Sequence, residues 1–156
     1  MELLALVARV LIGALLVVAG TLKAHDGPAL TASTIAAYRL LPPVIVAPLG
    51  VALPYLEIFL GAYLVLGLFT RVAASVAALQ FAVFGAAVAS LVVRHIPADC
   101  GCFGSSVATP PSWWHVAGDV VLAAVALGIA RAGPGRVSVD ERLWGGPYAA
   151  QGEGSR

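Results

Sequence analysis

Four long stretches of this chain are almost free of charged side chains. A helix that crosses a bilayer needs about 20 mostly apolar residues. The stretches of about that length are residues 3–22, 44–69, 72–93 and 113–130. Their apolar runs are continuous rather than alternating, which excludes a membrane β-barrel. We therefore predict an all-α fold, an integral membrane four-helix bundle with a loop that carries the cysteines.

The composition agrees with a membrane protein and excludes several other classes. Of the 156 residues, 60% are hydrophobic and 11% are charged, whereas a soluble domain has about 25% charged residues. High hydrophobicity with so little net charge also excludes an intrinsically disordered chain. The formal net charge of +1 provides no electrostatic attraction for nucleic acid. We expect one domain in the lipid bilayer over residues 1–130 and a tail over 131–156.

Basic residues beside the span ends predict the orientation, because cytoplasmic loops carry an excess of Lys and Arg. With four spans, both termini share one side of the membrane. That side holds six basic residues, which are Arg9, Arg71, Arg131, Arg136, Arg142 and Arg156. The opposite side holds three, which are Lys23, Arg39 and Arg94. We therefore expect a multi-pass protein of the cell membrane, with cytoplasmic termini and tail and an extracytoplasmic loop over 94–112.

The first apolar stretch could also be a secretory signal peptide. Its start, Met1-Glu2, has no basic cluster, and no clean cleavage site of small residues follows it. Signal peptides carry both features, so we expect an uncleaved helix that packs against the other three spans.

Both cysteines lie in the predicted extracytoplasmic loop, with Gly101 between Cys100 and Cys102. That compartment permits disulfides. A bridge across one residue closes almost no loop and so stabilises little, while its strained geometry makes it easy to reduce. Gly101 and Gly104 should supply backbone angles that larger residues resist. We predict that Cys100 and Cys102 form a catalytic thiol–disulfide pair.

Two other interpretations of the cysteines stay open. They could be inert thiols. They could also belong to a metal site with His95, Asp99 or His115, since zinc and Cu(I) both accept thiolates. The redox pair is our prediction, and we assign no metal ligand.

Ionisable side chains inside spans are costly and usually face the bundle interior. At the helical rise, Arg9 lies roughly 9 Å from one membrane face and Glu57 roughly 20 Å from the other. In a hydrocarbon core about 30 Å thick those depths coincide, so we predict an intramembrane ion pair between Arg9 and Glu57. The alternative is that Arg9 reaches the headgroups and Glu57 is protonated.

A second group of ionisable residues lies near the cysteine loop. Asp119 follows His115 by one helical turn, so it could orient that ring and accept protons from thiol chemistry. The alternative is a buried carboxylate bonded to backbone. Trp113 and Trp114 are typical of a membrane-interface belt, and they are also candidate contacts for a bound quinone cofactor.

The connection after the first span has a helical pattern of its own. Leu30, Ile35, Tyr38 and Leu41 recur at near-helical spacing. The pattern predicts a short amphipathic helix that lies on the outer surface.

These features together resemble the methylamine utilisation protein MauE family, within the broader DoxX-like four-helix membrane proteins. Arg9 is followed by Ala19-Gly20-Thr21-Leu22-Lys23, as in the first helix of that group. Further on come Tyr38-Arg39-Leu40-Leu41-Pro42 and Leu53-Pro54-Tyr55-Leu56-Glu57. The most specific motif is Cys100-Gly101-Cys102-Phe103-Gly104, just before the last span. The resemblance covers about residues 5–130.

The resemblance implies a role in extracytoplasmic thiol redox chemistry. Proteins of the family are linked to disulfide maturation of methylamine dehydrogenase and are associated with a thioredoxin-like partner. Cys100 and Cys102 would be the redox pair, and Arg9, Lys23 and Glu57 would be framework positions. Two alternatives stay open, a non-enzymatic membrane scaffold for a secreted redox protein and a small metal- or solute-handling protein. The sequence fixes neither enzymatic activity nor oligomeric state.

Overall fold

The computed structural model describes residues 2–101, 104 and 109–133, and the regular structure in that part of the chain is entirely helical. The helices are α1 (Glu2–Asp26), α2 (Pro28–Ala37), α3 (Pro43–Leu66), α4 (Thr70–Val93) and α5 (Trp113–Ala132). The predicted all-α class is confirmed. Residues 134–156 of the predicted tail lie outside the described residues.

Four of these helices are long and apolar enough to cross a membrane. They cover Leu3–Asp26, Pro43–Leu66, Thr70–Val93 and Trp113–Ala132. The four-helix prediction is confirmed, but α1 continues to Asp26 instead of ending at Leu22. Lys23, which the sequence interpretation placed in a loop, therefore belongs to the last turn of a spanning helix.

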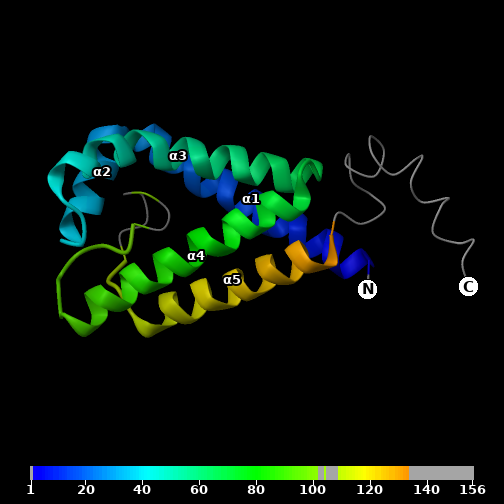
Figure 1. The fold of residues 1–156 in the computed structure, drawn as a ribbon. Helices are drawn as coiled ribbons and strands as arrows, with labels where there is room; N and C mark the ends of the chain where they lie inside the picture. The colour runs from blue at the N-terminus through cyan, green and yellow to red at the C-terminus, as the bar shows by residue number, and fades with distance from the viewer. Residues whose placement is uncertain (1, 102–103, 105–108, 134–156) are drawn as a thin grey trace, which may run out of the picture.

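The spanning helices form two layers. Figure 1 shows α1 beside α3 in one layer and α4 beside α5 in the other, and these are the two most extensively packed pairs. The layers meet at the end that holds the start of α1 and the end of α5, and they spread toward α2. The bundle therefore has a closed end and an open end.

Glycines let α1 approach α3 closely. A Cβ atom on Gly13 would lie 2.8 Å from the Gly61 carbonyl oxygen, and one on Gly20 would lie 2.6 Å from the Pro54 carbonyl oxygen. Real Cβ atoms do not approach so closely, so these positions require glycine, as is common where spanning helices pack. The two contacts also fix the register of the antiparallel pair.

The hydrophobic core fills the closed end of the bundle. It combines one face of each spanning helix, and the small residues of α4 let that helix sit deeply between its neighbours. The buried core residues are Ile12, Leu16, Leu60, Leu64, Ala73, Ala74, Ala77, Ala78, Phe81, Ala126 and Ile129. None of them comes from α2 or from the connection that carries Cys100. This hydrophobic cluster therefore does not extend to α2 at the open end.

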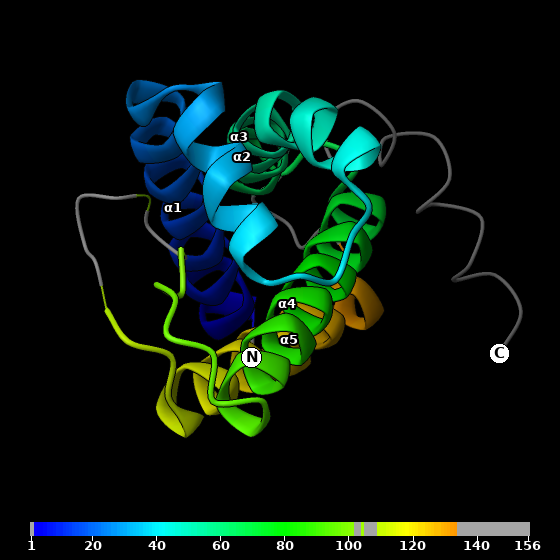
Figure 2. The same cartoon turned by 90° about the vertical axis from the view of Figure 1, so that its left-hand side faces the viewer.

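The short helix α2 lies at the open end. A helix in this connection was predicted and is present, but it ends at Ala37, so Tyr38 and Leu41 of the pattern lie beyond it. It begins at Pro28 after Gly27, whose φ of +90° suits glycine. Instead of lying alone on the surface, α2 packs on α3, where a Cβ on Gly50 would lie 2.6 Å from the Pro28 carbonyl oxygen. Figure 2 looks into this end, with α1, α2, α3 and α4 arranged around it.

Candidate functional site

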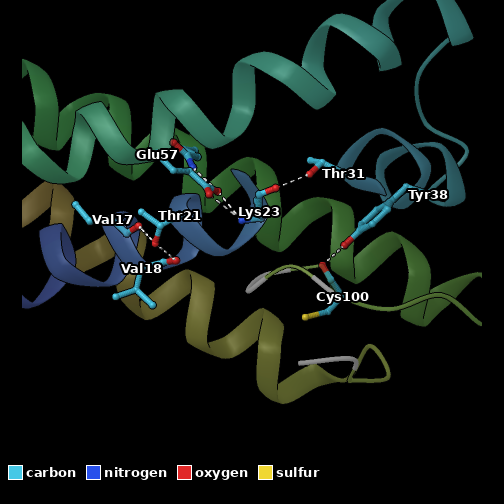
Figure 3. Close-up of polar contacts among 9 residues, drawn as sticks. Val17, Val18, Thr21, Lys23, Thr31, Tyr38, Glu57 and Cys100 are labelled. Atoms are coloured by element: carbon cyan, nitrogen blue, oxygen red, sulfur yellow. Dashed lines mark hydrogen bonds and ion pairs between the residues drawn. The ribbon is translucent and has the colours of Figure 1, made fainter. Parts of the chain in front are cut away.

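Cys100 is buried at the open end, on the connection between α4 and α5. Its backbone amide donates a hydrogen bond to the Thr109 carbonyl oxygen at 3.1 Å. Its carbonyl oxygen accepts a hydrogen bond from the Tyr38 hydroxyl at the end of α2 (Figure 3). Arg94 donates in turn to the Tyr38 carbonyl oxygen at 3.0 Å. Backbone contacts on both sides therefore hold the cysteine in place.

The two glycines of the cysteine motif have the backbone geometry that the sequence predicts. Gly101 has φ of +64° and Gly104 has φ of +70°, a region that side chains with a Cβ avoid. A Cβ atom on Gly101 would also lie 2.6 Å from Cγ2 of Thr34 in α2. Gly101 therefore lets the cysteine segment lie directly against α2. Cys102 and Phe103 lie outside the described residues.

The Cys100 thiol begins a row of polar groups. Its sulfur lies 3.5 Å from Thr109 Oγ1, and that hydroxyl lies 3.5 Å from Nε2 of His115. Nδ1 of the same ring lies 2.8 Å from Ser112 Oγ. In Figure 3 the sulfur points toward α5, away from Tyr38. The thiol is thus connected through one hydroxyl to a titratable ring.

Asp119 lies one turn beyond His115 on α5 and is buried, with 8% of its surface exposed. It is close enough to Cys100, His115 and Lys23 to interact with each electrostatically. Its Oδ2 atom has no hydrogen-bond partner among the described residues. The expected group of His115 and Asp119 near the cysteine is therefore brought together. The hydrogen-bond partners of the ring, however, are Ser112 and Thr109.

Glu57 has a different partner from the predicted one. Nζ of Lys23 donates to both of its carboxylate oxygens, at 2.8 and 2.9 Å, and Gln80 Nε2 donates at 3.2 Å (Figure 3). Both members of the ion pair are buried, with 4% and 1% of the side-chain surface exposed. The ammonium also lies 5.6 Å from the centre of the Phe84 ring, which is a favourable cation–π distance.

The helix register explains why Lys23 replaces the predicted Arg9 beside Glu57. The Cβ of Glu57 faces Gly20, whereas Gly13 faces Gly61. Arg9, which is also buried, lies four residues beyond Gly13 toward the closed end. At about 1.5 Å per residue it sits roughly 16 Å along α1 from the level of Glu57. The depth estimate failed because it counted each residue from the start of its own span and did not include the register of α1 against α3.

An apolar cavity of about 560 Å³ opens beside Lys23 and Cys100. Its polar lining includes Lys23, Thr31, Tyr38 and Cys100. Trp113 and Trp114 are not among the residues that line it, and they are 60% and 86% exposed. Their exposed position at the start of α5 suits an interface belt. No group of three or more His, Cys, Asp or Glu side chains in the described ranges is placed to hold a metal ion.

The fold and site define a class of protein, a multi-pass four-helix membrane protein with a buried thiol beside a cavity at its open end. The sequence model of the methylamine utilisation protein MauE family matches residues 1–131. The chain belongs to that family, which confirms the resemblance found in its motifs.

One relative extends the comparison. The methylamine utilization protein MauE of Paracoccus denitrificans is 37% identical to this chain over 101 residues. The match covers 64% of this chain and 54% of the relative, so the chain spans about half the length of that protein. No solved structure matches the chain.

Several residues of the site could not be singled out from the sequence. Thr109 and Ser112 are ordinary loop residues until the fold brings them to His115, and Gln80 reaches Glu57 only across the helix interface. Tyr38 stood in the helical pattern after the first span and in a motif that resembles the family, but neither signal connected it to Cys100. Lys23 was available as a family-like position, but its role depended on the length of α1.

Proposed function

We propose that this protein is a membrane thiol–disulfide redox component that uses Cys100 and Cys102. Its partner would be an extracytoplasmic protein like thioredoxin, and its task the disulfide maturation of methylamine dehydrogenase or of other secreted proteins. The single observation that carries the proposal is the row of groups from Cys100 through Thr109 to His115. Buried structural cysteines are normally inert in apolar surroundings, whereas this thiol adjoins groups that can take a proton.

The geometry supports a path for the proton. A thiol must lose its proton before it attacks, because the thiolate is the nucleophile. Cys100 gives its proton to the Thr109 hydroxyl, which passes its own proton to Nε2 of His115. This transfer requires the proton of the neutral ring on Nδ1, where it can donate to Ser112 Oγ. The negative charge of Asp119 then stabilises the imidazolium.

The burial of Cys100 assigns a different step of the exchange to each cysteine. Cys100 is 6% exposed, so a folded partner cannot reach its sulfur. The sequence has two cysteines, which leaves Cys102 to form the mixed disulfide with the partner. The Cys100 thiolate then attacks the Cys102 sulfur. One S–S bond forms within this chain, the bond to the partner breaks, and the partner leaves as a thiolate that takes the proton held by His115.

These steps conserve atoms and electrons. The dithiol of this chain becomes a disulfide while the disulfide of the partner becomes a dithiol, with two electrons transferred. Run in reverse, the same steps oxidise the partner. The shift in the redox state of the pair when the partner is deleted therefore reports the direction of electron flow.

A role in methylamine utilisation is supported by family membership and by the printed name of the Paracoccus relative. Handling of a solute or metal by Glu57 and Asp119 is a weaker proposal, since Glu57 is already engaged by Lys23 and Gln80. A static scaffold with a permanent Cys100–Cys102 clip is the alternative that an experiment must separate from redox cycling.

The test traps the redox state of the protein in living cells by acid quenching and labels thiols with a bulky maleimide. Redox cycling predicts both dithiol and disulfide forms, with the balance shifting when the thioredoxin-like partner is deleted. Ser75→Ala on the exposed face of α4 serves as the control. A fixed disulfide with and without that partner, or full methylamine growth of the Cys100→Ser/Cys102→Ser variant, would refute the proposal.

A further inference from the structure

The cavity at the open end has the form of a site for an amphipathic small molecule. Its volume of about 560 Å³ falls inside the range of about 300–1,000 Å³ typical of ligand pockets. Its walls come from α2, α3 and α4, from the end of α1 and from the connections that follow α2 and α4, and they are mostly aliphatic or aromatic. The apolar lining includes Leu30, Ile35, Leu49, Leu53, Val83 and Phe84.

Polar side chains interrupt the apolar lining of this chamber, among them Lys23, Asp26, Thr31, Tyr38 and Cys100. Cys100 lines it together with Lys23, whose ammonium is held against Glu57 and the Phe84 ring. A ligand that fits must combine an apolar body with a small polar head that lies near a thiol and a buried positive charge. An oxygen that gains negative charge during reaction would be stabilised by Lys23.

The cavity also continues to the outer surface of the helices. Leu30, Leu40 and Leu41 line it and are 41%, 49% and 42% exposed. The apolar lining therefore extends to a surface that a bilayer would contact. A molecule dissolved in the membrane can enter along this surface, whereas a water-soluble electron acceptor would lose its hydration without compensation.

We infer that this cavity binds a lipid-soluble quinone, with its ring beside Cys100 and Lys23 and its tail along the leucine-rich wall. As an electron acceptor it rests on the proposed function, in the direction in which this chain oxidises the partner and its own pair is left as a dithiol. The sequence holds two cysteines, so no second thiol pair in this chain can take the electrons. Disulfide formation breaks two S–H bonds and makes one S–S bond, and the quinone takes both electrons and both protons to become a quinol.

This assignment moves the quinone contact away from Trp113 and Trp114, which do not line the cavity. It also explains how Cys100 can be buried and still exchange electrons with an acceptor. Cys100, which a folded protein partner cannot reach, is one of the residues that line the chamber where a membrane-soluble acceptor would lie.

The test uses a benzoquinone with a short alkyl tail and a photoreactive azido group, added to the full-length protein in nanodiscs. Illumination should label peptides from the cavity lining, above all those of α2 and residues 83–90. Labelling confined to the peptide that contains Trp113, or a lack of saturable labelling, would overturn the assignment. Phospholipid that occupies the cavity and is not displaced by the quinone would overturn it as well.

A matched pair of variants adds a functional readout. Ala87→Phe fills the cavity, whereas Ala82→Phe makes the same change at an exposed position of α4 outside the lining. We expect at least tenfold weaker quinone binding and loss of quinone-dependent thiol oxidation in Ala87→Phe alone. Both variants should still form the mixed disulfide with the partner. If quinone binds normally but the double cysteine variant keeps full cellular activity, the proposed function fails and the binding site stands.

Discussion

Lys23 and Glu57 show how a single buried pair constrains a membrane protein. Replacing Glu57 with Gln leaves the Lys23 ammonium buried without its counter-charge. We predict that this change lowers the free energy of unfolding by about 3–5 kcal/mol, the usual effect of removing one partner of a buried ion pair. The double variant Lys23→Met/Glu57→Gln should lose less than the sum of the two single changes. Equilibrium unfolding in mixed micelles measures each value.

Arg9 provides the control for this double-mutant cycle. Because Arg9 lies level with the closed end, Arg9→Met and Glu57→Gln should be additive within about 0.5 kcal/mol. Stronger coupling of Glu57 to Arg9 than to Lys23 would contradict the register of α1 and α3 described above.

Replacing Thr109 tests the proposed proton path. Thr109→Val keeps the side-chain shape but removes the hydroxyl between Cys100 and His115. In a Cys102→Ser background we predict at least about a tenfold slower reaction of Cys100 with a small thiosulfonate reagent, since positioned proton transfer contributes about 10²–10⁴-fold in rate. Thr109→Ser should retain the rate of the parent. Equal rates in the valine and serine variants would remove Thr109 from the path.

At the scale of elements, the cysteine segment depends on its contact with α2. Gly101→Ala adds a Cβ at φ of +64° and within 2.6 Å of Thr34 Cγ2. The backbone alone should cost about 1–2 kcal/mol, and the clash should move the segment away from α2. We predict a lower melting temperature and faster labelling of Cys100. Thermal unfolding in detergent and the same thiosulfonate assay measure the two effects.

Gly128→Ala is the matched control for that change. Gly128 is helical, and a Cβ there meets nothing within 4 Å. Alanine should leave stability unchanged or raise it by up to about 1 kcal/mol through its better helix propensity. A similar loss of stability in Gly101→Ala and Gly128→Ala would mean that the contact of Gly101 with α2 does not determine the effect.

The elements themselves were largely predictable from the sequence. Long apolar runs mark the spans because the bilayer sets their length, and the spacing of Leu30 and Ile35 marked α2. The end of α1 was missed because Lys23 and Asp26 resemble a loop composition. In the structure Lys23 is tolerated inside the helix because the Glu57 carboxylate neutralises its charge, and Gln80 donates a further hydrogen bond to that carboxylate.

At the scale of the whole molecule, the sequence indicated which residues carry chemistry but not how they are arranged. Cys100, His115 and Asp119 could be selected because polar groups are rare in the chain. The link from Cys100 through Thr109 to His115, and the cavity beside Cys100, depend on how two helix pairs diverge around α2. Such an arrangement arises from contacts between distant segments, which helix periodicity alone does not specify.

The most direct test of the central claim captures the partner of each cysteine separately. Single variants Cys100→Ser and Cys102→Ser, expressed in cells, are acid-quenched and examined for disulfide-linked adducts by non-reducing electrophoresis and mass spectrometry. The account predicts a thioredoxin-like adduct on Cys100→Ser, where Cys102 cannot be resolved, and none on Cys102→Ser. An adduct formed through the buried Cys100 instead, or no adduct on either variant, would contradict it.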